Sequence, residues 1–184
     1  MPAMLQYAYQ IEVERRGRRY TDNAATRQHI ASVARWLTSE DTRFGLLIYG
    51  TIGNGKTTLL NAIQRTINIL YDSAFQSQQH AVLSVSALDV AKRARDDNGS
   101  LDALKTCPLL HIDDIGCEPA TMKVWGNEVS PITEILYARY DRQLYTVCTS
   151  NLSLVDIEHR YGSRIADRFR EMFDTIAFEE ESFR

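Results

Sequence analysis

Residues 50–57 constrain the fold of this chain more than any other segment, because their sequence, GTIGNGKT, fits the pattern G-x-x-x-x-G-K-[ST]. A short apolar run at residues 44–49 precedes them, and apolar residues at helical spacing follow. A strand, a glycine-rich turn and a helix in this order direct backbone N–H groups and the positive end of a helix dipole at phosphate. The segment therefore predicts a phosphate-binding loop in an α/β domain. The alternative is a glycine-rich turn that matches by accident.

The residue types in this loop suit a nucleoside triphosphate with Mg²⁺. Lys56 can reach the β- and γ-phosphates, and the Thr57 hydroxyl can bind the metal. Glycines let the backbone approach the phosphates without a Cβ clash. We expect nucleotide contacts along the whole loop and from the residue after it: Gly50, Thr51, Ile52, Gly53, Asn54, Gly55, Lys56, Thr57 and Thr58.

Polar residues end two other apolar runs. Asp113 and Asp114 close the sequence LLHIDD, and Asn151 follows the run LYTVCT at residues 144–149. Asp113 is expected to hold Mg²⁺ opposite Thr57, usually through water, and Asp114 to orient or deprotonate the attacking water. Asn151 could bind the γ-phosphate or that water. The alternatives are a turn with two solvated aspartates, and an ordinary strand-ending turn or helix cap.

Apolar runs alternate with helical patterns along the chain. Strands are expected at residues 44–49, 81–85, 108–113, 144–149 and 174–178. This alternation predicts an α/β fold, a three-layer αβα sandwich around a five-stranded parallel sheet, with ligands at the carboxyl ends of the strands. His111 would then be a core residue. We expect residues 1–20 to form an N-terminal extension and residues 21–184 to form one domain.

Composition narrows the functional classes. The formal net charge of −3 gives no overall attraction to nucleic acid, so contact with DNA would need a local basic patch. No apolar run approaches the roughly 20 residues of a membrane helix. The three cysteines are odd in number and lack metal-ligand spacing, so free thiols in a reducing cytoplasm are expected.

Two local basic clusters are candidates for contact with DNA. Lys92, Arg93 and Arg95 could meet single-stranded DNA through its phosphates, or they could lie on a solvated amphipathic helix. Residues 15–19, with the sequence RRGRR, could form a DNA-facing arm. Acidic neighbours dilute this cluster, so a surface turn between short strands is favoured.

Two arginines near the C-terminus are candidates for contact with a neighbouring subunit. Arg164 and Arg168 are four residues apart, so on a helix they share a face. An arginine supplied to the γ-phosphate of a neighbour could stabilise the transition state of hydrolysis. The alternative is a solvated helix face that pairs with nearby acidic residues.

Four sequences, in this order, carry a resemblance to a known family: GTIGNGKTT, LLHIDDIG, CTSNL and RYGSRIADRF. Together they resemble the AAA+ ATPases of the DnaC/IstB helicase-loader group, which are bacterial helicase loaders and transposition helper ATPases related to the DnaA initiators. The resemblance covers about residues 22–178. It implies ATP and Mg²⁺ as cofactors and an AAA+ ATPase core. Because the chain ends near the expected fifth strand, the C-terminal helical lid of many AAA+ proteins is expected to be missing.

The resemblance also implies a role for individual residues. The roles are phosphate and metal for Lys56 and Thr57, metal for Asp113, water activation for Asp114, sensor 1 for Asn151, arginine finger for Arg168 with Arg164 as a second candidate, and an adenine-side contact near Asn23. Most AAA+ proteins carry glutamate where this chain has Asp114. Because aspartate is one methylene shorter, we expect slow turnover.

On this basis the expected function is an ATP-binding, slowly hydrolysing ATPase that acts as an ATP-gated assembly switch in DNA replication or mobile-element DNA processing. The expected partners are further copies of the chain, single-stranded DNA, and a helicase or a transposition or recombination protein, in the cytoplasm and with no membrane. Two alternatives stay open. One is a P-loop kinase that moves the γ-phosphate to a small acceptor, and the other is a nucleotide-gated binding module with negligible turnover.

Overall fold

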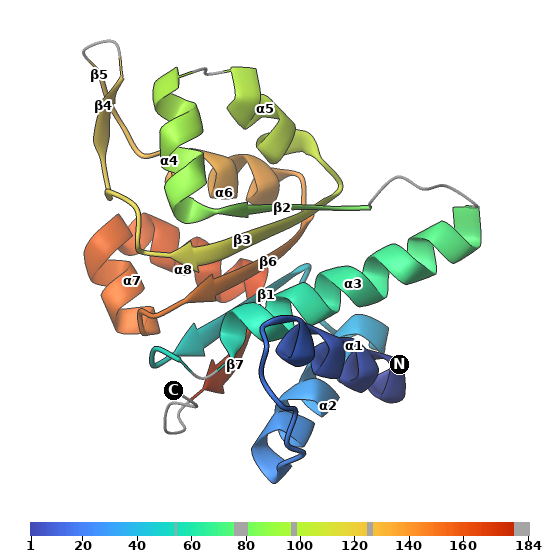
Figure 1. The fold of residues 1–184 in the computed structure, drawn as a ribbon. Coiled ribbons are helices and arrows are strands. Elements are labelled where there is room, and N and C mark those ends of the chain that lie inside the picture. The colour runs from blue at the N-terminus through green and yellow to red at the C-terminus, as the bar shows by residue number, and fades with distance from the viewer. Residues whose placement is uncertain (54, 76–80, 97–98, 125–126, 179–184) are drawn as a thin grey trace.

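A five-stranded parallel sheet forms the centre of the protein (Figure 1). The computed structural model describes residues 1–53, 55–75, 81–96, 99–124 and 127–178. The strand order is β2 (Val82–Ser86), β3 (Leu109–Ile115), β6 (Tyr145–Ser150), β1 (Gly45–Gly50) and β7 (Phe173–Phe178). All neighbouring strands pair in parallel, so their carboxyl ends lie at one edge of the sheet. The expected sheet is confirmed.

Helices cover both faces of this sheet. One face carries α1 (Pro2–Arg15), α2 (Ala24–Thr38) and α3 (Lys56–Phe75), and the other carries α4 (Ala87–Asp96), α5 (Gly99–Thr106), α6 (Pro131–Asp141), α7 (Leu154–Tyr161) and α8 (Ser163–Met172). Strand β1 serves both layers, because Leu46 and Ile48 join the first apolar cluster and Leu47 joins the second. Among the described residues, no helix is long and apolar enough to cross a bilayer.

The chain begins with a helix, α1, and not with the short strands expected around residues 15–19. This helix packs against α3 and α2 (Figure 1). Leu5 and Tyr9 lie in the apolar cluster that these helices share. Glu12 is only 4% exposed and forms an ion pair with Arg65 of α3, with an N–O distance of 2.8 Å. The N-terminal helix is therefore attached to the helix that follows the phosphate loop.

A small antiparallel ribbon also differs from the expected pattern. It consists of β4 (Met122–Val124) and β5 (Asn127–Val129), and it lies between β3 and α6 in the sequence. In Figure 1 it extends from the body of the protein beside α4, with which β4 is in contact. Strands of three residues each are too short to leave a periodic signal in the sequence.

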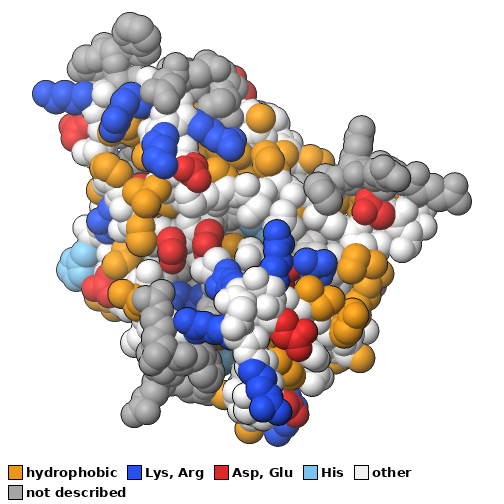
Figure 2. Space-filling view, in the orientation of Figure 1, with side chains coloured by type: hydrophobic (Ala, Val, Ile, Leu, Met, Phe, Trp, Pro, Cys, Tyr) orange, Lys and Arg blue, Asp and Glu red, His pale blue; other side chains and the backbone are white. Residues whose placement is uncertain are grey.

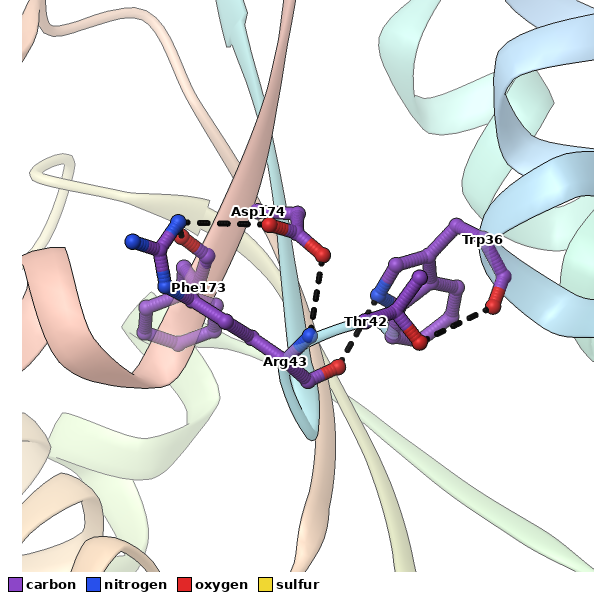
Figure 3. A network of polar contacts seen from close by, with 5 residues as sticks. All are labelled: Trp36, Thr42, Arg43, Phe173 and Asp174. Carbon is purple, nitrogen blue, oxygen red and sulfur yellow. Dashed lines mark hydrogen bonds and ion pairs between the residues drawn. The ribbon is translucent and has the colours of Figure 1, made fainter. Parts of the chain in front are cut away.

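A polar network fixes the amino ends of β1 and β7, opposite the edge where the phosphate loop lies (Figure 3). The Arg43 backbone N–H donates to Asp174 Oδ2 at 3.0 Å, and Arg43 Nη1 donates to Asp174 Oδ1 at 3.2 Å and to the Phe173 carbonyl at 3.2 Å. The Trp36 indole donates to the Arg43 carbonyl at 3.1 Å, and Thr42 Oγ1 donates to the Trp36 carbonyl at 3.4 Å. These bonds join the end of α2 to both strands and hold the start of β1 in register.

Candidate nucleotide-binding site

The phosphate loop runs from the end of β1 to the start of α3. Gly50 has φ +138°, and a Cβ at this position would collide with the Phe178 carbonyl oxygen of β7. Gly55 has φ +93°, and a Cβ there would lie 2.7 Å from the Tyr9 hydroxyl. Both positions require glycine for these reasons. Asn54, expected among the nucleotide contacts, lies outside the described residues.

Lys56 is held inside the loop. Lys56 is only 5% exposed, and its Nζ donates to the carbonyl of Gly50 at 2.9 Å and to that of Thr51 at 2.7 Å. Burial lowers the pKa of this ammonium, while the nearby carboxylates of Asp114 and Asp113 act in the opposite direction. A buried cation that is bonded to loop carbonyls is well placed to exchange those oxygens for phosphate oxygens.

Thr57 and Asp113 meet as the sequence predicts. Thr57 Oγ1 donates to Asp113 Oδ1 at 3.1 Å, and Thr149 Oγ1 at the end of β6 donates to the same oxygen at 2.5 Å. Burial raises the pKa of the Asp113 carboxyl, the Thr149 hydrogen bond lowers it, and the charge of Asp114 raises it. One carboxylate and one hydroxyl beside a phosphate loop fit Mg²⁺, which takes few protein ligands and keeps waters and phosphate oxygens.

Asp114 and Asn151 lie beside each other at the ends of β3 and β6. Asn151 Nδ2 donates to Asp114 Oδ1 at 3.3 Å, and the Asp114 backbone N–H donates to Thr149 Oγ1 at 2.8 Å. Asp114 has φ +57°, in the left-handed region, and the pairing of β3 with β6 shifts between Ile112 and Ile115. This local backbone strain turns the second aspartate of the pair into the cavity.

A cavity of about 610 Å³ collects these groups at the carboxyl edge of the sheet. The predicted residues that line it are Asn23, Ile52, Gly53, Gly55, Lys56, Thr57, Thr58, Asp114 and Asn151. Asn23 also caps α2, because its side-chain oxygen accepts a hydrogen bond from the Thr26 N–H at 2.7 Å. Tyr20 and Thr21 also line the cavity, close to Asn23 in the sequence. The segment expected to contact the adenine therefore lies on a wall of the same cavity.

The two candidate finger arginines lie outside this cavity, on α8. Arg164 is exposed in the first turn of the helix. Arg168 is half-buried, and its guanidinium lies 4.5 Å from the centre of the Tyr137 ring and 5.2 Å from that of Tyr140. The two side chains therefore differ in their freedom to reach another molecule.

The candidate DNA-binding residues also lie apart from the cavity, on α4. Lys92, Arg93 and Arg95 are exposed, and Lys92 Nζ forms an ion pair with Asp89 at 3.0 Å. Figure 2 shows several basic side chains gathered near the top of the view, over the region of α4 in Figure 1. The basic patch therefore exists on the surface.

Three arginines for which the sequence did not indicate a place near the nucleotide also line the cavity. Arg16, Arg18 and Arg19 belong to the RRGRR segment, for which a surface turn was favoured. The sequence shows that these arginines are clustered, but it does not show where the cluster lies in the fold. This position depends on the packing of α1 against α3, which brings the end of α1 to the phosphate loop.

The sequence is similar to that of a known replication protein, although no family model matches the chain. It is 32% identical, over 135 residues, to the replicative helicase loader DnaI of Bacillus subtilis (strain 168). The matched region is 73% of this chain and 42% of DnaI, so the chain spans less than half of that relative.

Solved structures show the same fold. A DnaC helicase loader superposes with a TM-score of 0.65 at 20% identity, covering 87% of this chain and 93% of that one. DnaA from Aquifex aeolicus bound to AMPPCP superposes with a TM-score of 0.62 at 19% identity, covering 88% of this chain and 49% of that one. Sequence and fold together place this chain in the DnaC-like group of AAA+ proteins.

Proposed function

We propose that this chain binds ATP with Mg²⁺ and hydrolyses the ATP slowly, at a site that a second protomer completes. One observation carries the proposal. Lys56 and Thr57 at the start of α3, Asp114 at the end of β3 and Asn151 after β6 line one cavity. Thr57 also donates a hydrogen bond to Asp113 of β3. The DnaA structure that shares this fold was solved with AMPPCP, a triphosphate analogue, which supports a nucleotide as the ligand.

Each of these residues has a task that its contacts support. Lys56 would bind the phosphates, and Thr57 and Asp113 would hold Mg²⁺, which neutralises phosphate charge when bound. Asp114 would accept the proton of the attacking water, and Asn151, at 3.3 Å from it, would orient the same water. The shorter reach of aspartate compared with glutamate supports slow turnover, as expected of a switch.

Completion of the site by a neighbour is part of the proposal. Within the described cavity lining, none of the arginines comes from α8. Arg164 is exposed at the start of α8 and is free to enter the cavity of a second copy, whereas Arg168 is stacked on two tyrosines. We therefore assign the finger role to Arg164 first, and ATP would act by joining two copies.

The biological setting follows from the relatives. DnaI and DnaC are helicase loaders by name, so a helicase or a related DNA-processing protein in replication or mobile-element DNA processing is the proposed partner. The exposed basic residues of α4 would bind the phosphates of single-stranded DNA. All three cysteines are unpaired, which fits a reducing cytoplasm.

Calorimetry with MgATP tests the binding step. The wild-type chain is expected to bind, and Lys56→Ala is expected to weaken affinity by about a hundredfold. Lys105→Ala is the matched control, because Lys105 is a basic residue on α5 that pairs with Glu134 outside the cavity. No measurable MgATP binding by the wild type would end the proposal.

Product analysis tests the reaction. Release of inorganic phosphate at a rate per protein molecule that rises with protein concentration supports an ATPase completed by a neighbour. A phosphorylated small acceptor would instead indicate a kinase, and tight binding without phosphate release at any concentration would indicate a nucleotide-gated binding module.

A further inference from the structure

Three exposed arginines lie on the wall of the nucleotide cavity and belong to the same chain as its phosphate loop. They are Arg16, Arg18 and Arg19, and they form the short link between α1 and α2, which we call the arginine segment (residues 16–19). In Figure 2 basic side chains gather near the middle of the face, where Figure 1 places this link beside the start of α3. The proposed binding of phosphate by Lys56, of metal by Thr57 and Asp113, and of water by Asp114 and Asn151 does not involve these side chains.

The arginine segment is fixed in position by α1. Glu12, one turn before the end of that helix, is buried and pairs with Arg65 of α3 at 2.8 Å. Tyr9, two turns before the end, is also buried and places its hydroxyl against Gly55 of the phosphate loop. Two contacts with α3 and the loop therefore hold the end of α1 at the cavity, so the segment does not depend on a partner for its place.

The charges at the cavity wall are unbalanced. Lys56 and the three arginines of the segment are cationic, whereas Asp114 is the single carboxylate in the described lining. Among the described residues, no carboxylate lies within ion-pair distance of Arg16, Arg18 or Arg19. An excess of unpaired guanidinium groups around a cavity favours a polyanion with several phosphates.

Arg16 is the member of the segment that directly follows α1, and it lines the cavity together with Val13 and Tyr9, which lie one and two turns earlier on that helix. The preceding residue, Arg15, provides a contrast, because it is not part of the cavity lining and its nearest carboxylate is Glu12 at 4.0 Å. Two adjacent arginines therefore face different surroundings.

We propose that Arg16 binds the terminal phosphate of ATP in cis, and that Arg18 and Arg19 neutralise the remaining phosphate charge. The proposal rests on the ATP binding proposed above. It makes α1 part of the nucleotide site, since this helix supplies a side chain that distinguishes a triphosphate from a diphosphate. Binding of ATP would then tighten the contact between the arginine segment and the phosphate loop within one protomer.

Calorimetry with MgATP and with MgADP tests this inference. Arg16→Ala is expected to weaken MgATP binding by about tenfold or more and MgADP binding by less than about twofold, because the contact is with the terminal phosphate. Arg16→Lys should recover part of the loss, since it keeps the charge but not the planar fork. Arg15→Ala is the matched control and should bind both nucleotides as the wild type does. Because all these side chains are exposed, the variants should keep the unfolding temperature of the wild type without nucleotide.

The other outcomes separate the inference from the proposed function. If Arg16→Ala keeps wild-type affinity for MgATP while Lys56→Ala loses it, the inference is wrong and ATP binding stands. If Arg15→Ala weakens binding as much as Arg16→Ala does, the effect is one of general charge and the specific contact is refuted. If Arg16→Ala loses affinity for a single-stranded oligonucleotide and not for MgATP, the segment binds nucleic acid and the inference falls. If the wild type binds no MgATP, both proposals fail.

Discussion

The guanidinium carbon of Arg168 lies 4.5 Å from the centre of the Tyr137 ring, so this arginine of α8 is stacked on α6. The same guanidinium carbon lies 5.2 Å from the centre of the Tyr140 ring. Arg164, one turn earlier on α8, is exposed. Sequence alone made both arginines candidates for one role, and their surroundings divide them into one that joins two helices and one that can reach a neighbour.

The first prediction concerns this division. Arg164→Ala should lower concentration-dependent phosphate release by about a thousandfold or more, the lower end of what a finger arginine supplies, without changing MgATP affinity or the unfolding temperature. Arg168→Ala should instead lower the free energy of unfolding by about 0.5–2 kcal/mol, because it removes the cation–π contacts. Phosphate-release assays over a range of protein concentrations, beside urea unfolding, would measure both. The reverse pattern would make Arg168 the finger.

The second prediction concerns Asp113. Because its pKa is raised by burial, the ionised carboxylate destabilises the nucleotide-free protein, and this penalty grows as the pH rises above the usual carboxyl pKa and through the raised one. Asp113→Asn removes the charge and keeps an oxygen that accepts from Thr57 and Thr149. The nucleotide-free variant should gain stability, on the order of 1 kcal/mol.

The same variant should lose the response to MgATP. Wild-type protein is expected to unfold at a higher temperature with MgATP than without it, and Asp113→Asn should show much less of this shift because a metal ligand is gone. Thermal unfolding with and without MgATP, and with ATP plus a chelator, measures the effect. An unchanged MgATP shift in Asp113→Asn would remove Asp113 from the metal site.

The parts of the site that sequence predicted are those with local causes. Gly50 and Gly55 are recognisable in the sequence because the backbone conformation and close contacts at both positions exclude a Cβ. These local requirements place glycines at a fixed spacing. Asp113 and Asn151 follow apolar runs, and parallel pairing of the runs brings their ends together. Because β1 and β3 belong to the same parallel sheet, the loop after β1 and the end of β3 lie at one edge, and Thr57 contacts Asp113.

The parts that sequence missed have causes in tertiary packing. The arginine segment reaches the cavity only because α1 lies on α3, and that packing depends on buried contacts such as the pair of Glu12 with Arg65, 53 residues apart. The sequence alone does not show which part of the fold such a basic cluster faces, because that depends on these contacts. The stacking of Arg168 on Tyr137, 31 positions earlier, likewise depends on how α8 packs against α6.

The third prediction is a pH dependence caused by His111. This residue is wholly buried, as expected from the sequence, and burial lowers its pKa from 6.5 to about 3. Between these pH values the unfolded chain binds a proton that the folded chain does not. The free energy of unfolding should therefore fall by about 1.4 kcal/mol per pH unit from this group as the pH drops below about 6.

Comparison of variants isolates this effect. His111→Leu should show a shallower loss of stability between pH 6 and pH 4.5 than the wild type, whatever its stability at neutral pH. His159→Gln is the control, because His159 is exposed on α7 and should leave the slope unchanged. Urea unfolding at several pH values gives the slopes. Equal slopes for wild type and His111→Leu would contradict the prediction.

The fourth prediction concerns Arg139, a fully buried cation at 0% exposure. Its guanidinium donates to Thr146 Oγ1 at 2.8 Å and to the carbonyls of Leu104 at 2.9 Å, Cys107 at 2.8 Å and Tyr145 at 2.6 Å. None of these acceptors is a carboxylate, and burial lowers the pKa of the group. The side chain thus joins the end of α5 to β6 through α6.

Removal of this side chain should destabilise the fold strongly. Arg139→Ala leaves several buried acceptors without a donor and opens a cavity, so we expect a loss of about 3–5 kcal/mol in the free energy of unfolding. Arg139→Lys should recover little, because one ammonium cannot reach acceptors arranged for a planar fork. Arg142→Ala, an exposed arginine three residues later, is the matched control and should change stability by less than about 0.5 kcal/mol. If chemical denaturation finds Arg139→Ala as stable as Arg142→Ala, the buried network does not hold these elements together.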